Sequence, residues 1–184
     1  FLRLLYVKLG TQFCPDCDVA IEPQSVEQIA ARILKDYRND RIGLLAPLVV
    51  NRKGYYTDLA KWAAGKGYTH LRVDGEFIPT SPWPRLARFK EHTIELPVAD
   101  IRVTPDNEAA LRAGLAAALD HGKGIVQVLG GLDTLAEAMA KKDARRIRLT
   151  EAVYSVKRAC PSCNRSFPEL DPRLFSYNSK HGWC

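Results

Sequence analysis

The stretch Ile42-Gly43-Leu44-Leu45-Ala46-Pro47-Leu48-Val49-Val50 is a nearly continuous apolar run of strand length. Only Gly43 and Pro47 interrupt it. Such a run is typical of a buried strand, and a sheet tolerates proline only near a strand end or at an edge. The run therefore predicts a buried strand with Pro47 in one of those two places.

Helical patterns flank this strand on both sides. Before it, Ser25 begins a helix that ends at Asn39, with Gln28 in the capping-box position. After it, residues 54–65 suit a second helix, and a third covers residues 104–121, where proline follows a cap residue. Shorter helices are expected over residues 1–9 and 132–142.

Alternating apolar and polar residues mark the remaining strands. Residues 71–77 predict a half-buried strand or a hairpin that turns at Asp74-Gly75. Residues 92–103 are the longest strand signal, and the apolar parity switches near Ala99, which predicts a bulge or a bend. Two more strands are expected over residues 125–129 and 151–157. The order of elements predicts an α+β domain, with a mixed sheet and helices packed on one face.

Two cysteine pairs bracket this domain, Cys14-Pro15-Asp16-Cys17 and Cys160-Pro161-Ser162-Cys163. Each tight turn directs two thiolates to one point, and two such pairs make the soft tetrahedral site that Zn²⁺ prefers. Redox pairs and plain structural thiols are the alternatives, but neither pair begins a helix in a thioredoxin-like unit. The domain is thus expected to be inserted between two zinc knuckles.

The division of the cysteines among sites is left open by the spacing. One shared site fits if a whole domain lies in the gap of 142 residues between Cys17 and Cys160. Alternatively Cys160, Cys163 and Cys184 are ligands of a separate site that another cysteine completes, since 20 residues separate Cys163 from Cys184. The chain opens without Met and stops at Cys184, so both ends are expected to be cuts inside a larger protein.

The composition is that of a folded protein. The chain has 184 residues, of which 46% are apolar and 26% charged, and a net charge of +6. These values exclude a largely disordered or collagen-like chain, and no apolar run reaches the ~18 residues of a membrane span. A mildly basic balance is compatible with nucleic acid or an acidic partner. With no signal peptide, a cytoplasmic location and no membrane contact are expected.

Partner recognition is the function that the charged loops favour. No phosphate-binding loop is present, because Gly65-Lys66-Gly67 and Gly122-Lys123-Gly124 are only turn signals around a lysine. The chain is therefore predicted not to be an enzyme, with no catalytic residue. A docking surface of mixed charge is predicted instead, although each charge alone also fits a merely solvated face. The candidate partner-binding residues are Arg52, Lys53, Lys61, Lys66, Arg72, Arg85 and Arg88.

A zinc-dependent DNA-binding module is the alternative function. A basic stripe lies beside the second cysteine pair, and phosphate contacts would make DNA affinity fall steeply with salt. The stripe consists of Lys141, Lys142, Arg145, Arg146, Arg148, Lys157, Arg158 and Arg165.

Several motifs resemble the UvrA family, the ATPase component of the bacterial ABC excinuclease, over essentially all 184 residues. The most specific is the stretch Phe167-Pro168-Glu169-Leu170-Asp171-Pro172-Arg173-Leu174-Phe175-Ser176-Tyr177-Asn178-Ser179, which follows the second cysteine pair. Others are Leu2-Arg3-Leu4-Leu5-Tyr6, Leu44-Leu45-Ala46-Pro47, Arg72-Val73-Asp74-Gly75-Glu76 and His92-Thr93-Ile94-Glu95.

The resemblance implies a fragment of an ABC-type ATPase that dimerises, senses damaged double-stranded DNA and loads UvrB in bacterial nucleotide excision repair. Residues 24–152 then look like the UvrB-binding domain, and residues 1–23 and 153–184 like parts of the surrounding zinc-bearing signature domain. It also implies a finger of Cys160, Cys163, Cys184 and a later cysteine, or a pairing of Cys14 and Cys17 with Cys160 and Cys163 at the neck of the insertion. ATP and Mg²⁺ would bind only elsewhere in the parent protein.

Overall fold

The structure is a computed structural model that describes residues 1–133, 149–160, 162–163 and 165–181. The helices are α1 (Leu2–Leu9), α2 (Val26–Asp36), α3 (Thr57–Gly65) and α4 (Glu108–His121), with short 3₁₀ turns η1 (Pro105–Asn107) and η3 (Pro172–Phe175). The strands are β1 (Arg41–Lys53), β2 (His70–Val73), β3 (Glu76–Pro79), β4 (Glu91–Arg102), β5 (Ile125–Gly130) and β6 (Thr150–Ser155). None of the helices in the described ranges is long and apolar enough to cross a membrane. Most of the helix expected over 132–142 lies outside the described residues.

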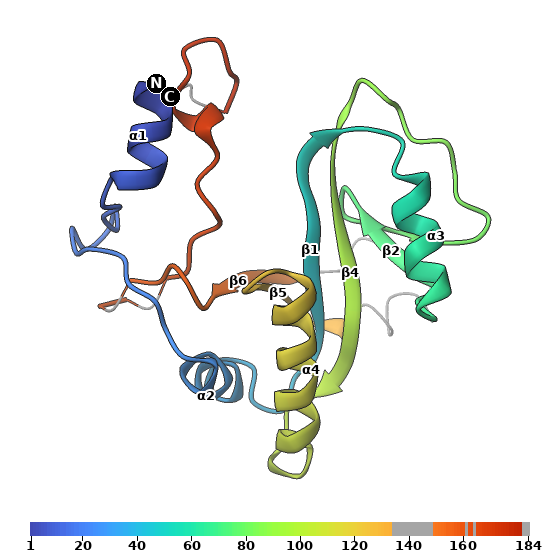
Figure 1. The fold of residues 1–184 in the computed structure, drawn as a ribbon. Helices are drawn as coiled ribbons and strands as arrows, with labels where there is room; N and C mark the ends of the chain where they lie inside the picture. The colour runs from blue at the N-terminus through green and yellow to red at the C-terminus, as the bar shows by residue number, and fades with distance from the viewer. Residues whose placement is uncertain (134–148, 161, 164, 182–184) are drawn as a thin grey trace.

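The six strands form one sheet in the order β3-β2-β4-β1-β5-β6. The long strands β1 and β4 run side by side through the molecule (Figure 1). The α+β class is confirmed. The sheet, however, is antiparallel in every described strand pair and not mixed. The physical reason is the path of the chain, which leaves β1, passes through α3 and the β2–β3 hairpin, and then returns along β1 in the opposite direction.

Pro47 lies within β1, in the middle of the sheet, yet it breaks no hydrogen-bond ladder. The β5 ladder covers only Gly43 to Leu45 of β1, whereas β4 continues alongside Pro47, which is paired with Glu95. Beyond Leu45 the β5 side of β1 is therefore a local edge, where a missing N–H costs nothing. The expectation of an edge position holds in this local sense.

Two local features of the strands match their sequence signals. The pairing of β1 with β4 shifts by one residue between Leu44 and Leu45, which leaves Val98 as the extra residue of a bulge. The bulge lies close to the parity switch at Ala99. The β2–β3 hairpin turns at Asp74 and Gly75, which have φ angles of 52° and 94°. Two positive φ values in a two-residue turn match the right-handed twist of the strands.

Helices α2, α3 and α4 pack on one face of the sheet. A first core cluster joins α2 and α4 to the sheet through residues such as Ile33, Leu115 and Leu44. A second cluster joins α3 to β2 and β4, and it includes Ala46. Side chains alternate along a strand, so Leu44 and Ala46 lie on the same face of β1. Both clusters therefore share one face, with α4 toward one end of the long strands and α3 toward the other (Figure 1).

The opposite face of the sheet is curled around a buried arginine. Arg72 on β2 donates to Glu95 on β4 over 2.8 Å, and it also forms an ion pair with Glu151 on β6. Three strands separate β2 from β6, so a flat sheet would hold them about 19 Å apart. The sheet must curl to close this gap. Arg72 and Glu95 are consequently 7% and 3% exposed.

The segment after the second cysteine pair, residues 165–181, returns past the ends of β1 and β4. We call it the return segment. Arg173 in this segment donates to the carbonyl of Asn51 over 3.1 Å and lies 3.4 Å from the carboxylate of Glu91. The carboxylate of Glu91 also forms an ion pair with the amine of Lys180, at 2.8 Å. On the other side of the return segment, η3 packs against α1, and the Tyr6 ring stacks on Phe175.

Candidate functional site

The first cysteine pair lies in a tight turn of the chain. The Cys14 N–H donates to the carbonyl of Val19, and the Asp18 N–H donates back to the carbonyl of Cys14, both over 2.9 Å. A β-bridge between Phe13 and Ala20 closes the turn. The proline after Cys14 and the positive φ of Asp18, 53°, suit this reversal. Both thiols therefore project from one knuckle.

The second pair is built in the same way. The Cys160 N–H donates to the carbonyl of Arg165 over 2.8 Å, and a bridge between Ala159 and Ser166 closes the knuckle. The backbone N–H of Cys163 points at the sulfur of Cys160, 3.5 Å away. An N–H directed at a sulfur stabilises the thiolate form that metals bind.

Backbone hydrogen bonds tie the two knuckles together. Glu22 and Ala159 exchange both of their N–H···O bonds, each 2.8 Å long. The side chain of Gln24 reinforces the joint, because it donates to the carbonyl of Ser155 and to the hydroxyl of Ser166 at 2.9 Å. The strand that enters the domain and the strand that leaves it thus pair at one neck.

This joint brings four thiols into one cluster. The sulfurs of Cys14, Cys17, Cys160 and Cys163 all lie within 4.8 Å of one another, and those of Cys14 and Cys163 are 3.8 Å apart. Four sulfurs at ~2.3 Å from one Zn²⁺ form a tetrahedron with edges of about 3.8 Å. The donor set and its size therefore fit a structural zinc site.

The charges of the thiols also favour a cation. The N–H of Cys163 lowers the pKa of Cys160 to about 7, whereas a hydrogen bond with Cys163 raises the pKa of Cys17 to about 12. Four thiolates at this distance repel one another, so the cluster keeps protons unless a cation balances the charge. Cys14 and Cys160 are buried, and Phe167 packs against them, which shields the cluster on that side.

The structure thus brings together the two knuckles, which is one of the two arrangements that the spacing allowed. Cys14 and Cys17 meet Cys160 and Cys163 across the inserted domain. Cys184, the fifth cysteine, lies outside the described residues. The cluster of four has a full tetrahedral set of sulfurs without it.

The predicted docking residues do not all lie in equivalent places. Lys53, Lys61, Lys66, Arg85 and Arg88 are exposed, and none of the ion pairs found among the described residues includes them.

Arg52 and Arg72 are already engaged within the chain. Arg52 is exposed but lies 3.3 Å from Asp171 of the return segment. Arg72 is buried between Glu95 and Glu151, so its charge supports the sheet. Burial lowers the pKa of Arg72, but the two carboxylates raise it more, and the guanidinium stays charged. An exposed docking role does not fit this position.

Sequence reasoning missed the aromatic residues that lie beside Arg85 and Arg88, two of the predicted docking residues. Tyr55 follows β1, and the loop from Ser81 to Lys90 carries Trp83 and Phe89. Phe89 is 80% exposed. The available signal was the alternation of aromatic and arginine residues in the segment Trp83-Pro84-Arg85-Leu86-Ala87-Arg88-Phe89.

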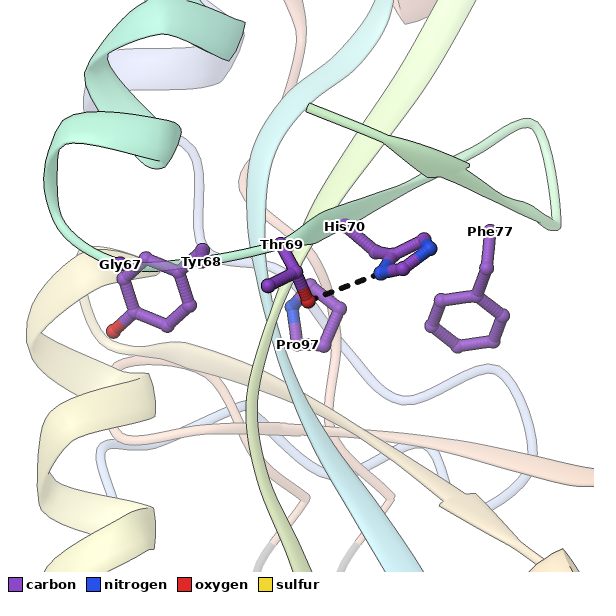
Figure 2. Close-up of a pocket in the computed structure, with 6 residues that line it drawn as sticks. All are labelled: Gly67, Tyr68, Thr69, His70, Phe77 and Pro97. Atoms are coloured by element: carbon purple, nitrogen blue, oxygen red, sulfur yellow. Dashed lines mark hydrogen bonds between the residues drawn. The ribbon is translucent and has the colours of Figure 1, made fainter. Parts of the chain in front are cut away.

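A cavity of about 450 Å³ lies beside the β2–β3 hairpin and is lined by Gly67, Tyr68, Thr69, His70, Phe77 and Pro97 (Figure 2). Its one titratable imidazole, His70, contacts the hydroxyl of Thr69 at 3.0 Å. None of the described residues that line this cavity carries a carboxylate. Among the described residues that line the cavity, the Thr69 hydroxyl and the His70 imidazole form a pair without the carboxylate that orients the base in a catalytic triad.

The basic stripe of the alternative DNA-binding function falls mostly outside the described residues. This applies to Lys141, Lys142, Arg145, Arg146 and Arg148. Of the other members, Arg165 is paired with Asp16 over 2.6 Å, while Lys157 is exposed and Arg158 partly buried. The stripe stays a prediction.

Comparison with known proteins connects these features to one family. A family profile described as "UvrA interaction domain" matches residues 24–131. The chain is 36% identical over 184 residues to "UvrABC system protein A" of Haemophilus influenzae, and 35% identical over 186 residues to that of Staphylococcus aureus. It is also 36% identical to the protein of Escherichia coli O127:H6. Each alignment covers 100% of this chain and 18% of the relative.

Proposed function

Because the chain belongs to the UvrA interaction domain family, we propose that it is the protein-binding part of a UvrA and that its partner is UvrB. In this proposal residues 24–152 dock UvrB, and residues 1–23 and 153–184 belong to the surrounding zinc-bearing signature domain. The parent protein dimerises, uses ATP and Mg²⁺, and loads UvrB on damaged double-stranded DNA during nucleotide excision repair in the cytoplasm. This chain contributes recognition and no catalytic step.

The exposed basic residues carry this proposal. Five lysines and arginines on the side of α3 and the loops around it lack carboxylate partners among the described residues. Unpaired cations on one side of a domain attract a partner of opposite charge and raise the rate of encounter. Exposed charges are weakened by salt, so the association is expected to be salt-dependent.

Zinc has a structural role in this proposal. Cys14, Cys17, Cys160 and Cys163 would hold one Zn²⁺, and the ion would lock the two strands that cross the neck. The ion supplies charge balance for four thiolates and no reactive position, because four sulfurs fill a tetrahedral shell. The docking domain would then be presented on a fixed base.

Titration calorimetry of the 184-residue chain with purified UvrB tests the function. We expect a saturable complex whose affinity falls between 50 and 300 mM salt, roughly as Debye screening predicts. Lys53→Glu is expected to weaken binding, whereas Lys35→Glu on α2, at the other end of β1, leaves it unchanged. A folded chain that produces no heat of binding at any salt concentration would exclude UvrB docking.

A further inference from the structure

Two arginines share one tyrosine ring on the side of the domain that carries α3 and the loops around it, which we call the docking side. The guanidinium carbon of Arg85 is 5.3 Å from the centroid of the Tyr55 ring, and that of Arg88 is 5.8 Å from it. Arg85 also donates to the Tyr55 hydroxyl over 3.2 Å. We call Tyr55, Trp83, Arg85 and Arg88 the arginine–tyrosine cluster.

The loop that carries these arginines is anchored to the sheet. His92, at the start of β4 and 4% exposed, contacts the carbonyl of Ala87 with one ring nitrogen at 3.0 Å and the carboxylate of Asp74 with the other at 2.9 Å. The indole N–H of Trp83 donates to the carbonyl of Tyr55 over 3.1 Å. The cluster is therefore held in place before any partner arrives, which lowers the entropic cost of binding.

Charge in the cluster is uncompensated. Neither Arg85 nor Arg88 has a carboxylate within ion-pair distance among the described residues, whereas arginines such as Arg41 and Arg102 are paired with Asp100 and Asp133. A guanidinium that lies over an aromatic ring keeps N–H groups along its edge available for a partner, and Arg85 uses one of its own for the Tyr55 hydroxyl. That edge matches a carboxylate through two parallel hydrogen bonds.

Apolar surface adjoins this charge. A hollow of about 260 Å³ is lined by Tyr55, Thr57, Trp83, Pro84 and Arg85. Beside it, Arg88 lies 5.7 Å from the exposed ring of Phe89. Tryptophan, tyrosine and arginine next to a small hollow are the residue types that most often dominate binding energy at protein interfaces.

We propose that the arginine–tyrosine cluster anchors an acidic segment of the protein partner, in which an Asp or Glu lies next to an apolar side chain. The carboxylate binds the guanidinium edges of Arg85 and Arg88, and the apolar side chain fills the hollow beside Trp83. This inference rests on the proposed function and specifies which part of the docking side carries it.

A protein segment fits the cluster better than a nucleic acid does. Single-stranded nucleic acids stack their bases on free aromatic faces. Two guanidinium groups already lie over the Tyr55 ring, so it is not a free platform.

Charge reversal tests the anchor. We expect Arg85→Glu and Arg88→Glu each to weaken UvrB binding at least tenfold by titration calorimetry. Arg38→Glu, an exposed arginine before β1 and outside the docking side, serves as the matched control and stays within twofold of the wild type. Arg85→Gln removes the guanidinium without adding a negative charge, and it replaces Arg85→Glu if that variant loses its thermal unfolding transition. Wild-type affinity in the Arg85 and Arg88 variants, with UvrB bound by the wild type, overturns the anchor alone. No binding by the wild type overturns the function itself.

Zero-length crosslinking tests the partner's chemistry. A carbodiimide joins a lysine amine directly to a carboxylate, so Arg88→Lys treated with UvrB is expected to give a crosslink from position 88 to an Asp or Glu of UvrB. Arg38→Lys is expected to give none at position 38. If Arg88→Glu abolishes binding of a labelled DNA strand and leaves UvrB binding intact, the partner class is nucleic acid and the proposal fails.

Discussion

Arg72 on β2 and Glu95 on β4 face each other across an antiparallel strand pair, and their 2.8 Å ion pair lies almost out of reach of solvent. Burial raises the pKa of Glu95, although Arg72 opposes the shift. The free energy gained by such a pair is largely offset by desolvation, but the loss of one partner leaves a buried charge.

The first prediction concerns this pair. Arg72→Met is expected to lower the free energy of unfolding by about 3–5 kcal/mol, because Glu95 is left without its cation. The double variant Arg72→Met/Glu95→Met should recover most of that loss. Urea unfolding followed by circular dichroism measures both. Arg112→Met, which removes the exposed pair with Glu108, is the control and should cost less than about 1 kcal/mol.

The second prediction concerns acid stability of the return segment. Arg173 beside Asp171 lowers the pKa of that carboxyl to about 2. An unfolded Asp has a pKa of about 3.9, so between pH 2 and 4 the unfolded chain binds more protons and stability rises with pH. Asp171 therefore contributes its full stabilisation above about pH 4 and loses it as the pH falls to about 2. The free energy of unfolding of Asp171→Asn should be lower than that of the wild type at pH 6, and the two values should converge near pH 2.

The third prediction concerns the metal. We expect about one zinc per chain by elemental analysis, and well below one in Cys14→Ser and Cys160→Ser. Cys184→Ser should keep its zinc, because four other sulfurs complete the cluster. Retention of a full zinc in Cys14→Ser would show that the ligands are divided differently.

Chelation extends this prediction to folding. The inserted domain has its own core clusters, so removal of zinc should loosen the neck and leave the sheet intact. Hydrogen exchange should rise at Glu22 and Ala159 and stay slow at Leu44. Loss of all far-ultraviolet circular dichroism on chelation would mean that the domain depends on the metal.

The fourth prediction compares two helical glycines. A Cβ at Gly114 in α4 would lie 3.0 Å from the Cβ of Ala99, so Gly114→Ala should overpack the sheet contact and cost about 1–3 kcal/mol. A Cβ at Gly65, at the end of α3, would point into open space, with no atom of the described residues within 4 Å apart from its chain neighbours and the backbone of its own helix. Gly65→Ala should be neutral or stabilise the protein by about 0.4–1 kcal/mol. In thermal unfolding, the midpoint temperature of Gly114→Ala should be below that of the wild type, and the midpoint of Gly65→Ala should equal or exceed it.

Local sequence signals predicted the elements well where neighbouring residues decide the structure. Ser25 and Gln28 form the capping box that begins α2, and Asp74-Gly75 makes the hairpin turn. The 142 residues between the cysteine pairs hold a domain that returns to its starting point, as a shared zinc site requires. Each of these features depends on a few adjacent residues or on a fixed ligand spacing.

Long-range geometry was outside the reach of those signals. The sequence contains nothing that pairs Arg72 with Glu151, because the contact depends on the curl of five strands. Arg72 therefore looked like another surface cation. The stack of Arg85 and Arg88 on Tyr55 likewise joins residues about 30 apart through the path of a loop. The antiparallel order followed from the return of β4 along β1, which element order alone leaves open.

The paired strands at Glu22 and Ala159 also make the inserted domain portable. Since the two crossing points are held 2.8 Å apart from donor to acceptor, a short linker could close the gap if everything between them were removed. The host chain would keep its path, and the domain could be gained, lost or exchanged as one cassette. If the domain docks a partner as proposed, variation in that partner can be met by changes confined to the cassette, without disturbance to the protein that carries it.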